Sequence, residues 1–341
     1  MIRRALALIA FSTLVPAGAA PNATPPARFD LTRPEIRGFI AEVAKRNSMK
    51  TAAVRQLMRK AAPQPKIIEL MTKPAEKVSP WWQYRERFLT EERISRGAQF
   101  WQDNREPLER IAAQHGVPPE YIVAIIGVET YYGRIMGRFR VIDALATLAF
   151  DYPPRSEFFR KELEEFIVLA RENKLDTLAV TGSYAGAMGA PQFMPSSYRR
   201  YAEDGNDDGV RDLWAAWPDV FASVANYFRE HGWQTGGPVV VDGKLAPDPV
   251  FQINPKNLEL NETLASLNAT GVQVDLPLPQ DTRAVLISAE QRDGPAYRVG
   301  FNNFYVITRY NRSARYAMAV SDLAEAVAAR VRSLPSPAAP K

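Results

Sequence analysis

The chain has 341 residues, of which 46% are hydrophobic and 24% are charged, a composition typical of globular proteins. It contains no cysteine, which excludes a disulfide framework and a thiolate nucleophile. The formal net charge is +5 and falls to about +3 without Arg3 and Arg4, which is too small a surplus to indicate nucleic-acid binding. With only two histidines, a multi-histidine zinc site is also excluded.

The first 20 residues have the three parts of a secretory signal. Arg3 and Arg4 are followed by a largely apolar run over 5–15 and by small residues over 16–20. That run is too short to cross a bilayer, and no later segment has the roughly 18 consecutive apolar residues that a transmembrane helix needs. We therefore predict a monomeric protein that is exported and soluble in the periplasm, with no lipid-anchor cysteine after the signal.

Helical patterns dominate the chain as far as Gly237. After a Pro- and Ala-rich lead-in, Thr32 and Glu35 have capping-box spacing and predict the start of a helix. The apolar stripe of that helix consists of Ile36, Phe39, Ile40 and Val43. Further helices are predicted over 52–60, 80–102, 119–129, 155–171 and 216–231.

The residue pattern changes after Gly237. Short β-type runs follow, over 238–241, 272–276, 283–288 and 296–301, before a helical pattern returns over 316–331. We predict an α+β protein that is mainly α. The predicted parts are an N-terminal helical region (21–80), a helical core (81–236), a small antiparallel β region (237–302), a C-terminal segment that packs back on the core (303–333) and a loose tail (334–341).

Glu129 is the candidate catalytic residue. It continues the apolar stripe of Ile122, Ile125 and Ile126 at helical spacing, so its carboxyl group is expected to be buried. Burial raises the pKa of a carboxyl group, as a general acid needs near neutral pH. The alternative is an ordinary helix-end glutamate that pairs with Arg134 or Arg138.

A glycine-rich stretch over 182–198 is a candidate ligand wall. It lacks the Gly-Lys-Ser/Thr ending of a phosphate-binding loop. Ser183 and Gln192 offer hydrogen bonds, and the small residues between them let the backbone approach a ligand, which suits a sugar polymer. The alternative is a tightly packed turn between two helices.

An acidic stretch matches the opening of an EF-hand loop over 204–215. Its candidate ligands are the side chains of Asp204, Asn206, Asp208 and Asp212 and the backbone carbonyl of Val210. Ala215 stands where the last, bidentate glutamate belongs. We expect a weak structural Ca²⁺ or Na⁺ site there, or else an acidic turn without metal.

Several separated motifs together resemble the lytic murein transglycosylase B family, which cleaves peptidoglycan. The motifs are Gly-Val-Glu129-Thr, Ser183-Tyr-Ala-Gly-Ala-Met-Gly, Gln192-Phe-Met-Pro-Ser-Ser-Tyr, the acidic loop, Ser223-Val-Ala-Asn-Tyr227-Phe and Asn303-Phe-Tyr-Val-Ile-Thr-Arg-Tyr310-Asn. The resemblance spans roughly residues 81–320. It implies a lysozyme-like helical catalytic core over 81–236, flanked by the helical region and the small β region.

The resemblance also implies roles for individual residues. Glu129 matches the single catalytic acid/base of the family. The substrate-binding positions that it implies are Tyr84, Ser183, Gln192, Tyr227, Tyr305, Tyr310 and Arg155. The chain departs from the family at Ala215, at Pro154, where an arginine is expected beside Arg155, and in lacking a lipid-anchor cysteine.

The implied reaction cuts the bond between N-acetylmuramic acid and N-acetylglucosamine and forms a 1,6-anhydromuramoyl end, with help from the substrate's N-acetyl group. No cofactor is required, and the partners expected are glycan strands and other cell-wall enzymes. Two alternatives stay open: a hydrolytic muramidase, which needs a second carboxylate, and a non-catalytic peptidoglycan-binding protein. Asp143 and Asp151 are the carboxylates nearest downstream.

Overall fold

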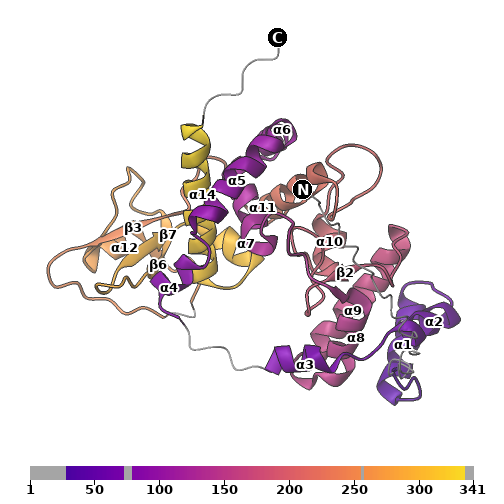
Figure 1. The fold of residues 1–341 in the computed structure, drawn as a ribbon. Coiled ribbons are helices and arrows are strands. Elements are labelled where there is room, and N and C mark those ends of the chain that lie inside the picture. The colour runs from indigo at the N-terminus through magenta and orange to yellow at the C-terminus, as the bar shows by residue number, and fades with distance from the viewer. Residues whose placement is uncertain (1–27, 73–78, 255–256, 335–341) are drawn as a thin grey trace, which may run out of the picture.

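A computed structural model describes residues 28–72, 79–254 and 257–334 (Figure 1). The predicted signal segment and most of the lead-in and tail lie outside the described residues. The described chain is mainly helical and carries small antiparallel sheets, which confirms the predicted fold class.

The N-terminal helices are α1 (Pro34–Arg46), α2 (Thr51–Lys60) and α3 (Pro65–Thr72). The predicted apolar stripe of α1 is buried, but the predicted capping box is wrong. Thr32 donates its hydroxyl hydrogen to Asp30, while Glu35 pairs with Arg33, so neither side chain caps the helix. The helix instead begins at Pro34, because the fixed φ of proline suits a first helical turn, which needs no N–H donor there.

The helices around the candidate site are α4 (Trp81–Glu86), α5 (Glu91–Asp103), α6 (Arg105–His115) and α7 (Pro119–Thr130). The single helix predicted over 80–102 is thus two helices. They separate at Thr90, whose side chain accepts a hydrogen bond from the Arg93 N–H and caps α5.

Two C-terminal helices complete this part of the molecule: α13 (Asn302–Tyr310) and α14 (Ala314–Ser333). The sequence analysis missed α13. Figure 1 shows α14, in yellow, beside the purple helices α5 and α7, and it packs against both. The end of the chain therefore supplies side chains to the surroundings of Glu129.

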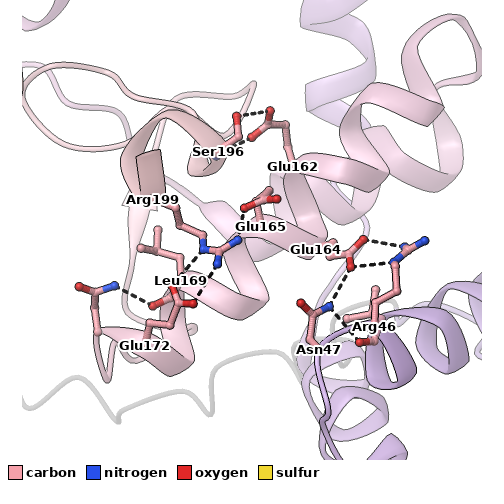
Figure 2. A network of polar contacts seen from close by, with 11 residues as sticks. Arg46, Asn47, Glu162, Glu164, Glu165, Leu169, Glu172, Ser196 and Arg199 are labelled. Carbon is pink, nitrogen blue, oxygen red and sulfur yellow. Dashed lines mark hydrogen bonds and ion pairs between the residues drawn. The ribbon is translucent and has the colours of Figure 1, made fainter. Parts of the chain in front are cut away.

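A second helical group consists of α8 (Val141–Asp151), the short 3₁₀ turn η1 (Pro153–Arg155), α9 (Ser156–Glu172) and α10 (Pro195–Tyr201). Helix α11 (Trp217–Glu230) packs mainly against α6 and also contacts α10, so it joins the two groups. Polar contacts tie α9 to its neighbours (Figure 2). Arg46 of α1 pairs with Glu164, and Arg199 of α10 pairs with Glu165 and Glu172. A two-stranded antiparallel sheet pairs β1 (Phe139–Arg140), which precedes α8 in the chain, with β2 (Thr181–Gly182), which lies between α9 and α10 in the chain.

The β region is a five-stranded antiparallel sheet with the order β4-β6-β7-β3-β5. Its elements are β3 (Val240–Leu245), β4 (Glu262–Thr263), α12 (Leu264–Ala269), β5 (Val272–Gln273), β6 (Arg283–Ser288) and β7 (Tyr297–Gly300). The sequence analysis placed β6 correctly but missed β4 and α12. The β region has its own small apolar core, which includes Leu264, Val299 and Phe301.

Candidate active site

Glu129 lies in the last turn of α7, at a point where the chain reverses. Tyr131 and Tyr132, just after it, both have positive φ, of 53° and 59°. Gly127 makes this turn possible, because a Cβ atom there would lie only 2.7 Å from the Tyr132 ring. The buried Tyr132 ring therefore packs against Gly127, and its hydroxyl group donates to the Arg93 carbonyl of α5.

The Glu129 carboxyl group is enclosed but keeps access to solvent, since the residue is half-buried. Its Oε1 accepts a 2.5 Å hydrogen bond from the Tyr316 hydroxyl of α14. Burial raises the pKa of Glu129 to about 7, and the Tyr316 hydrogen bond acts in the opposite direction. Among the described residues no cation pairs with Glu129, so the alternative of an ion pair with Arg134 or Arg138 is wrong.

This pKa predicts how activity depends on pH. If Glu129 is a general acid, it must be protonated in the free enzyme, and kcat/KM should fall as the pH rises through about 7, the pKa of Glu129. Tyr316→Phe removes a donor that stabilises the charged form, so the pKa of Glu129 should rise and the falling limb should move to higher pH. Rates at substrate concentrations well below KM measure this shift; an unmoved limb would show that Glu129 does not control it.

The glycine-rich loop is fastened to the end of α7. Thr130, next to Glu129, donates its hydroxyl hydrogen to the Ala190 carbonyl at 2.9 Å. Ser183 accepts N–H bonds from Ala185 and Ala187, and among the described residues its hydroxyl hydrogen has no acceptor, so it can donate to a ligand. Gln192 donates its amide N–H groups to the carbonyls of Gly189 and Met136, and no donor in the described part of the chain reaches its side-chain oxygen, which can therefore accept from a ligand.

A group of tyrosines lies beside this loop. Tyr310 donates its hydroxyl hydrogen to the Pro191 carbonyl at 2.6 Å, and burial raises its pKa well above the usual value, with the charge of Glu129 adding to the rise. Tyr84 of α4 also lies within the electrostatic reach of Glu129. Tyr227 is buried against Tyr310, at 4.8 Å between ring centroids, and its hydroxyl group is bonded to the backbone. Tyr227 therefore supports the Tyr310 ring by packing against it.

Two of the predicted substrate-binding residues lie apart from this group. Tyr305 packs near Arg309 of its own helix, and in the described chain neither a ring contact nor a hydrogen bond joins it to the tyrosines around Glu129. Arg155 lies at the corner between α8 and α9, where its guanidinium covers the Phe158 ring at 4.3 Å.

The sequence analysis missed Tyr316 and Thr130. Tyr316 was recognised only as the start of a helix, 187 positions from Glu129, and no spacing in the sequence connects the two. Thr130 was quoted inside the Gly-Val-Glu129-Thr motif without a role. The only available signal was that Thr130 directly follows Glu129 and places a β-branched hydroxyl side chain at a helix end.

The carboxylates that could assist Glu129 are engaged elsewhere. Asp143 accepts bonds from Arg140 and from the backbone N–H of Ala62, and Asp151 pairs with Arg33. In the part of the chain that the structure describes, Glu129 forms its side-chain hydrogen bond with a tyrosine rather than with another acid. The arrangement thus offers one carboxyl group with a raised pKa, beside a wall of hydrogen-bonding and aromatic side chains.

The acidic loop is ordered by its own carboxylates. Asp204 accepts backbone N–H bonds from Asp208 and Gly209, and Asp208 accepts one from Val210. In the described residues, no cluster of three or more acidic or histidine side chains has the geometry of a metal site. The loop nonetheless has oxygen donors of the kind that Ca²⁺ prefers.

Asp219, which the sequence analysis did not consider, adds to this loop. Its two oxygens accept N–H bonds from Gly205 and Asp212, so it joins the two ends of the loop. Burial raises the pKa of Asp219, and the charges of Asp204 and Asp208 add to the rise, which places it within reach of the loop carboxylates. It lies four residues beyond Ala215, so ligand spacing did not reveal it.

A glutamate whose pKa is raised by burial is the arrangement that lysozyme, a glycan-cleaving enzyme, uses for its general acid. The family model described as "Transglycosylase SLT domain" matches residues 32–325. A curated relative, membrane-bound lytic murein transglycosylase B of Escherichia coli K12, is 40% identical over 309 residues, which cover 88% of this chain and 84% of the relative.

Two solved structures support the same assignment. The Escherichia coli lytic transglycosylase Slt35 in complex with calcium is 38% identical, with a TM-score of 0.81 over 90% of this chain and 97% of Slt35. SltB3 from Pseudomonas aeruginosa in complex with NAG-anhNAM-pentapeptide is 30% identical, with a TM-score of 0.74 over 86% of this chain and 78% of SltB3. The chain belongs to the lytic murein transglycosylase B family, as its motifs predicted, and is a lytic transglycosylase.

None of the helices within residues 28–72, 79–254 and 257–334 is both long and apolar enough to cross a bilayer.

Proposed function

We propose that this protein cleaves the β-1,4 bond between N-acetylmuramic acid and N-acetylglucosamine in peptidoglycan and leaves a 1,6-anhydromuramoyl end, with Glu129 as its single acid and base. The observation that carries the proposal is the enclosed Glu129 carboxyl group, whose pKa is raised to about 7 without an acidic partner in the described residues. The complex of SltB3 with an anhydro-sugar peptide supports this choice of product.

The proposed reaction balances without water. Protonated Glu129 donates its proton to the glycosidic oxygen, and the bond from that oxygen to the muramoyl C1 breaks. The carbonyl oxygen of the muramoyl N-acetyl group bonds to C1 and takes the place of a second enzyme carboxylate. The ionised Glu129 then removes the proton from the muramoyl 6-hydroxyl, and O6 displaces the acetamido oxygen from C1. The proton has returned to Glu129.

The neighbouring side chains fit this sequence of steps. The free hydroxyl hydrogen of Ser183 and the free side-chain oxygen of Gln192 are matched to the C=O and N–H of an acetamido group, respectively. Tyr84 and Tyr310 supply ring surfaces for sugar faces, and Tyr316 orients Glu129. Tyr305 and Arg155 would act, in this proposal, on parts of the strand farther from the cleaved bond.

The main alternative is hydrolysis, in which a water molecule attacks C1. It requires a second carboxylate about 5 to 10 Å from the acid to serve as nucleophile or base. Mass spectrometry of the fragments released from purified peptidoglycan in ¹⁸O-labelled water separates the two reactions. We expect anhydromuramoyl ends without label, whereas reducing ends that carry ¹⁸O would establish hydrolysis, and no fragments at all would favour a binding protein.

A structural Ca²⁺ ion in the acidic loop is a second part of the proposal. It is supported by the Slt35 complex with calcium and by Asp219, which offers a carboxylate where Ala215 does not. Asp204, Asn206, Asp208, Asp212 and the Val210 carbonyl would supply the other oxygens. The ion would hold the loop against α11 and takes no part in the chemistry.

Calcium should therefore stabilise the protein. At a concentration about 100-fold above Kd, a ligand contributes about 2.7 kcal/mol, which corresponds to a rise in Tm of several degrees. Asp204→Asn should abolish this rise in Tm. In the parent protein, chelation of calcium should reverse the rise. Asp207→Asn is the matched control, because residue 207 is not among the proposed ligands. An equal calcium response in both variants would place the ion elsewhere.

We further propose that the protein works in the periplasm, where its substrate lies. This rests on the signal-like pattern of residues 1–20 and on the absence of cysteine from the sequence.

A further inference from the structure

Two apolar side chains are exposed on the loops that carry Ser183 and Gln192 or touch them. Ile135 is 69% exposed and Tyr184 is 40% exposed. Ile135 belongs to the loop that follows the end of α7, and Tyr184 directly follows Ser183 in the chain. Within the described residues the Tyr184 ring packs against no other ring, and its hydroxyl group has no hydrogen-bond partner. The reaction steps proposed above use neither side chain.

Hydrogen bonds to Thr130 fix the loop that carries Ile135. The Ile135 N–H donates to the Thr130 carbonyl at 2.9 Å, and the Gly133 N–H donates to the Thr130 hydroxyl oxygen at 3.1 Å. Gly133 has a φ of 79°, and a Cβ atom there would lie 2.6 Å from the Trp217 ring. Because Thr130 directly follows Glu129, Ile135 is held in a fixed position relative to the helix end that carries Glu129.

A tight turn presents Tyr184 at its tip. The Gly186 N–H donates to the Ser183 carbonyl at 3.0 Å, and the Ser183 N–H donates to the Ala187 carbonyl at 2.8 Å. The Ser183 hydroxyl oxygen accepts two more backbone N–H groups of the same turn. Tyr184 is the second residue of the turn that runs from Ser183 to Gly186, so a well-bonded backbone supports its exposed ring.

The two loops are also bonded to each other. Gln192 donates its side-chain amide to the Met136 carbonyl at 3.2 Å. The next residue, Gly137, lies so close to the glycine-rich stretch that a Cβ atom there would be 2.1 Å from the Gly182 carbonyl oxygen and 2.6 Å from the Ser183 nitrogen. Its φ of 93° also requires glycine. The two exposed side chains therefore belong to one bonded unit with Ser183 and Gln192.

The chemistry of this unit suits a sugar. A sugar ring has an apolar C–H face and a polar edge, and a tyrosine offers an apolar ring with a polar tip. A single exposed apolar side chain needs no explanation, but two of them on one unit, beside hydrogen-bonding side chains, fit a ligand-binding surface. Because the turn and the loop are already fixed, a ligand would lose little affinity to their ordering.

We propose that Ile135 and Tyr184 bind a sugar of the glycan strand next to the sugar whose acetamido group lies against Ser183 and Gln192. The proposal rests on the proposed function and deepens it, since the protein would hold at least two consecutive sugars on this unit. Neither side chain would contact the reacting atoms. Both would therefore act on the affinity for the strand and not on the chemical step.

Binding without turnover tests the proposal. The probe is soluble glycan strands from peptidoglycan, and the Kd is measured by calorimetry in the full chain that carries Glu129→Gln. Adding Tyr184→Ala should raise the Kd by about tenfold or more, because the burial of an aromatic ring against the ligand is lost. Ile135→Ser should raise it by about fivefold. Tyr184→Phe keeps the ring and should recover most of the affinity.

Kinetics of the same substitutions in the chain with Glu129 intact give a second readout. KM for glycan strands should rise by the same factors while kcat stays within about twofold, because an interaction made equally in the ground state and the transition state affects KM alone. Val250→Ser is the matched control for Ile135→Ser. Val250 is an aliphatic side chain of the β region that is 79% exposed, and its loss should leave Kd and KM unchanged.

Three results would overturn the proposal. One is a Kd that Tyr184→Ala leaves unchanged, and another is a fall in kcat without a rise in KM. The third is an unchanged Kd for glycan strands together with lost binding of Ile135→Ser to vesicles of anionic phospholipid. That result would assign Ile135, which stands between the exposed Arg134 and Arg138, to a membrane surface instead.

This proposal and the proposed function fail in different ways. An absence of anhydromuramoyl ends from the products of the parent protein would contradict the proposed function, whereas the Kd comparison needs no turnover. Anhydromuramoyl ends from the parent protein, together with an unchanged Kd in the variants, would overturn the sugar contact alone.

Discussion

Glu129→Gln should lower the rate of peptidoglycan cleavage by about 10³-fold, the contribution typical of a general acid and base that acts in both steps. Glutamine keeps the size of the side chain and its ability to accept the Tyr316 hydrogen bond, but it has no proton to transfer. Release of soluble fragments, measured at the pH optimum of the parent protein, checks this expectation.

The same substitution should not weaken the fold. The pKa of Glu129 is raised on folding, from 4.5 to about 7, so its contribution to stability is complete below pH 4.5 and declines as the pH rises toward 7. Glu129→Gln removes that loss, and Tm at pH 8 should be equal to or above that of the parent. Glu120→Gln, in the first turn of the same helix, is the control and should keep full activity. A Glu129→Gln protein that is folded and active would rule out Glu129 as the acid.

Asp322→Ala should cause a large loss of stability. The Asp322 carboxylate of α14 is 6% exposed and accepts 2.6 Å bonds from Arg85 of α4 and from Arg298 of β7. Removal of one partner of a buried ion pair leaves a desolvated charge without compensation, here mainly on Arg298, which is 17% exposed. We expect a loss of about 3 kcal/mol in the free energy of unfolding.

The structure offers a matched control on the same cation. Asp242 also pairs with Arg298, at 3.0 Å, but it is 84% exposed. Asp242→Ala should therefore cost less than about 0.5 kcal/mol. Denaturant unfolding of both variants measures the difference, and similar losses would show that burial does not decide the strength of these pairs. Because Asp322 joins the β region to α4 and α14, this pair also tests how the sheet is held on the core.

Local patterns predicted most of the helices because their cause is local. The apolar stripe of α1, the proline at the start of α7 and Gly232 after the end of α11 each depend on residues within one or two turns. Thr32 shows the limit of such reasoning. Its spacing to Glu35 suits a capping box, but Thr32 bonds to Asp30 and Glu35 pairs with Arg33 instead. Helix α13 was missed because its residues from Phe304 to Thr308 are all aromatic or β-branched, and such residues favour strands over helices.

The candidate site depends on contacts between distant segments, so its sequence signal was weaker. The position of Glu129 on an apolar stripe indicated burial, but the hydrogen bond from Tyr316 arises only because α14 packs against α7. Likewise, the hydrogen bond from the Tyr310 hydroxyl to the Pro191 carbonyl and the bond that Asp219 accepts from the Gly205 N–H are products of tertiary packing. Residue spacing contains no information on either contact.

The most direct test of this account is the pKa of Glu129 itself. ¹³C NMR of protein labelled at the glutamate carboxyl carbons, compared between the parent protein and Glu129→Gln, identifies the resonance and follows its titration. We predict a midpoint near pH 7 that is absent from the variant. A midpoint near 4.5, the ordinary value for glutamate, would show that the carboxyl group is not desolvated, and Glu129 would then lack the proton that the proposed mechanism requires.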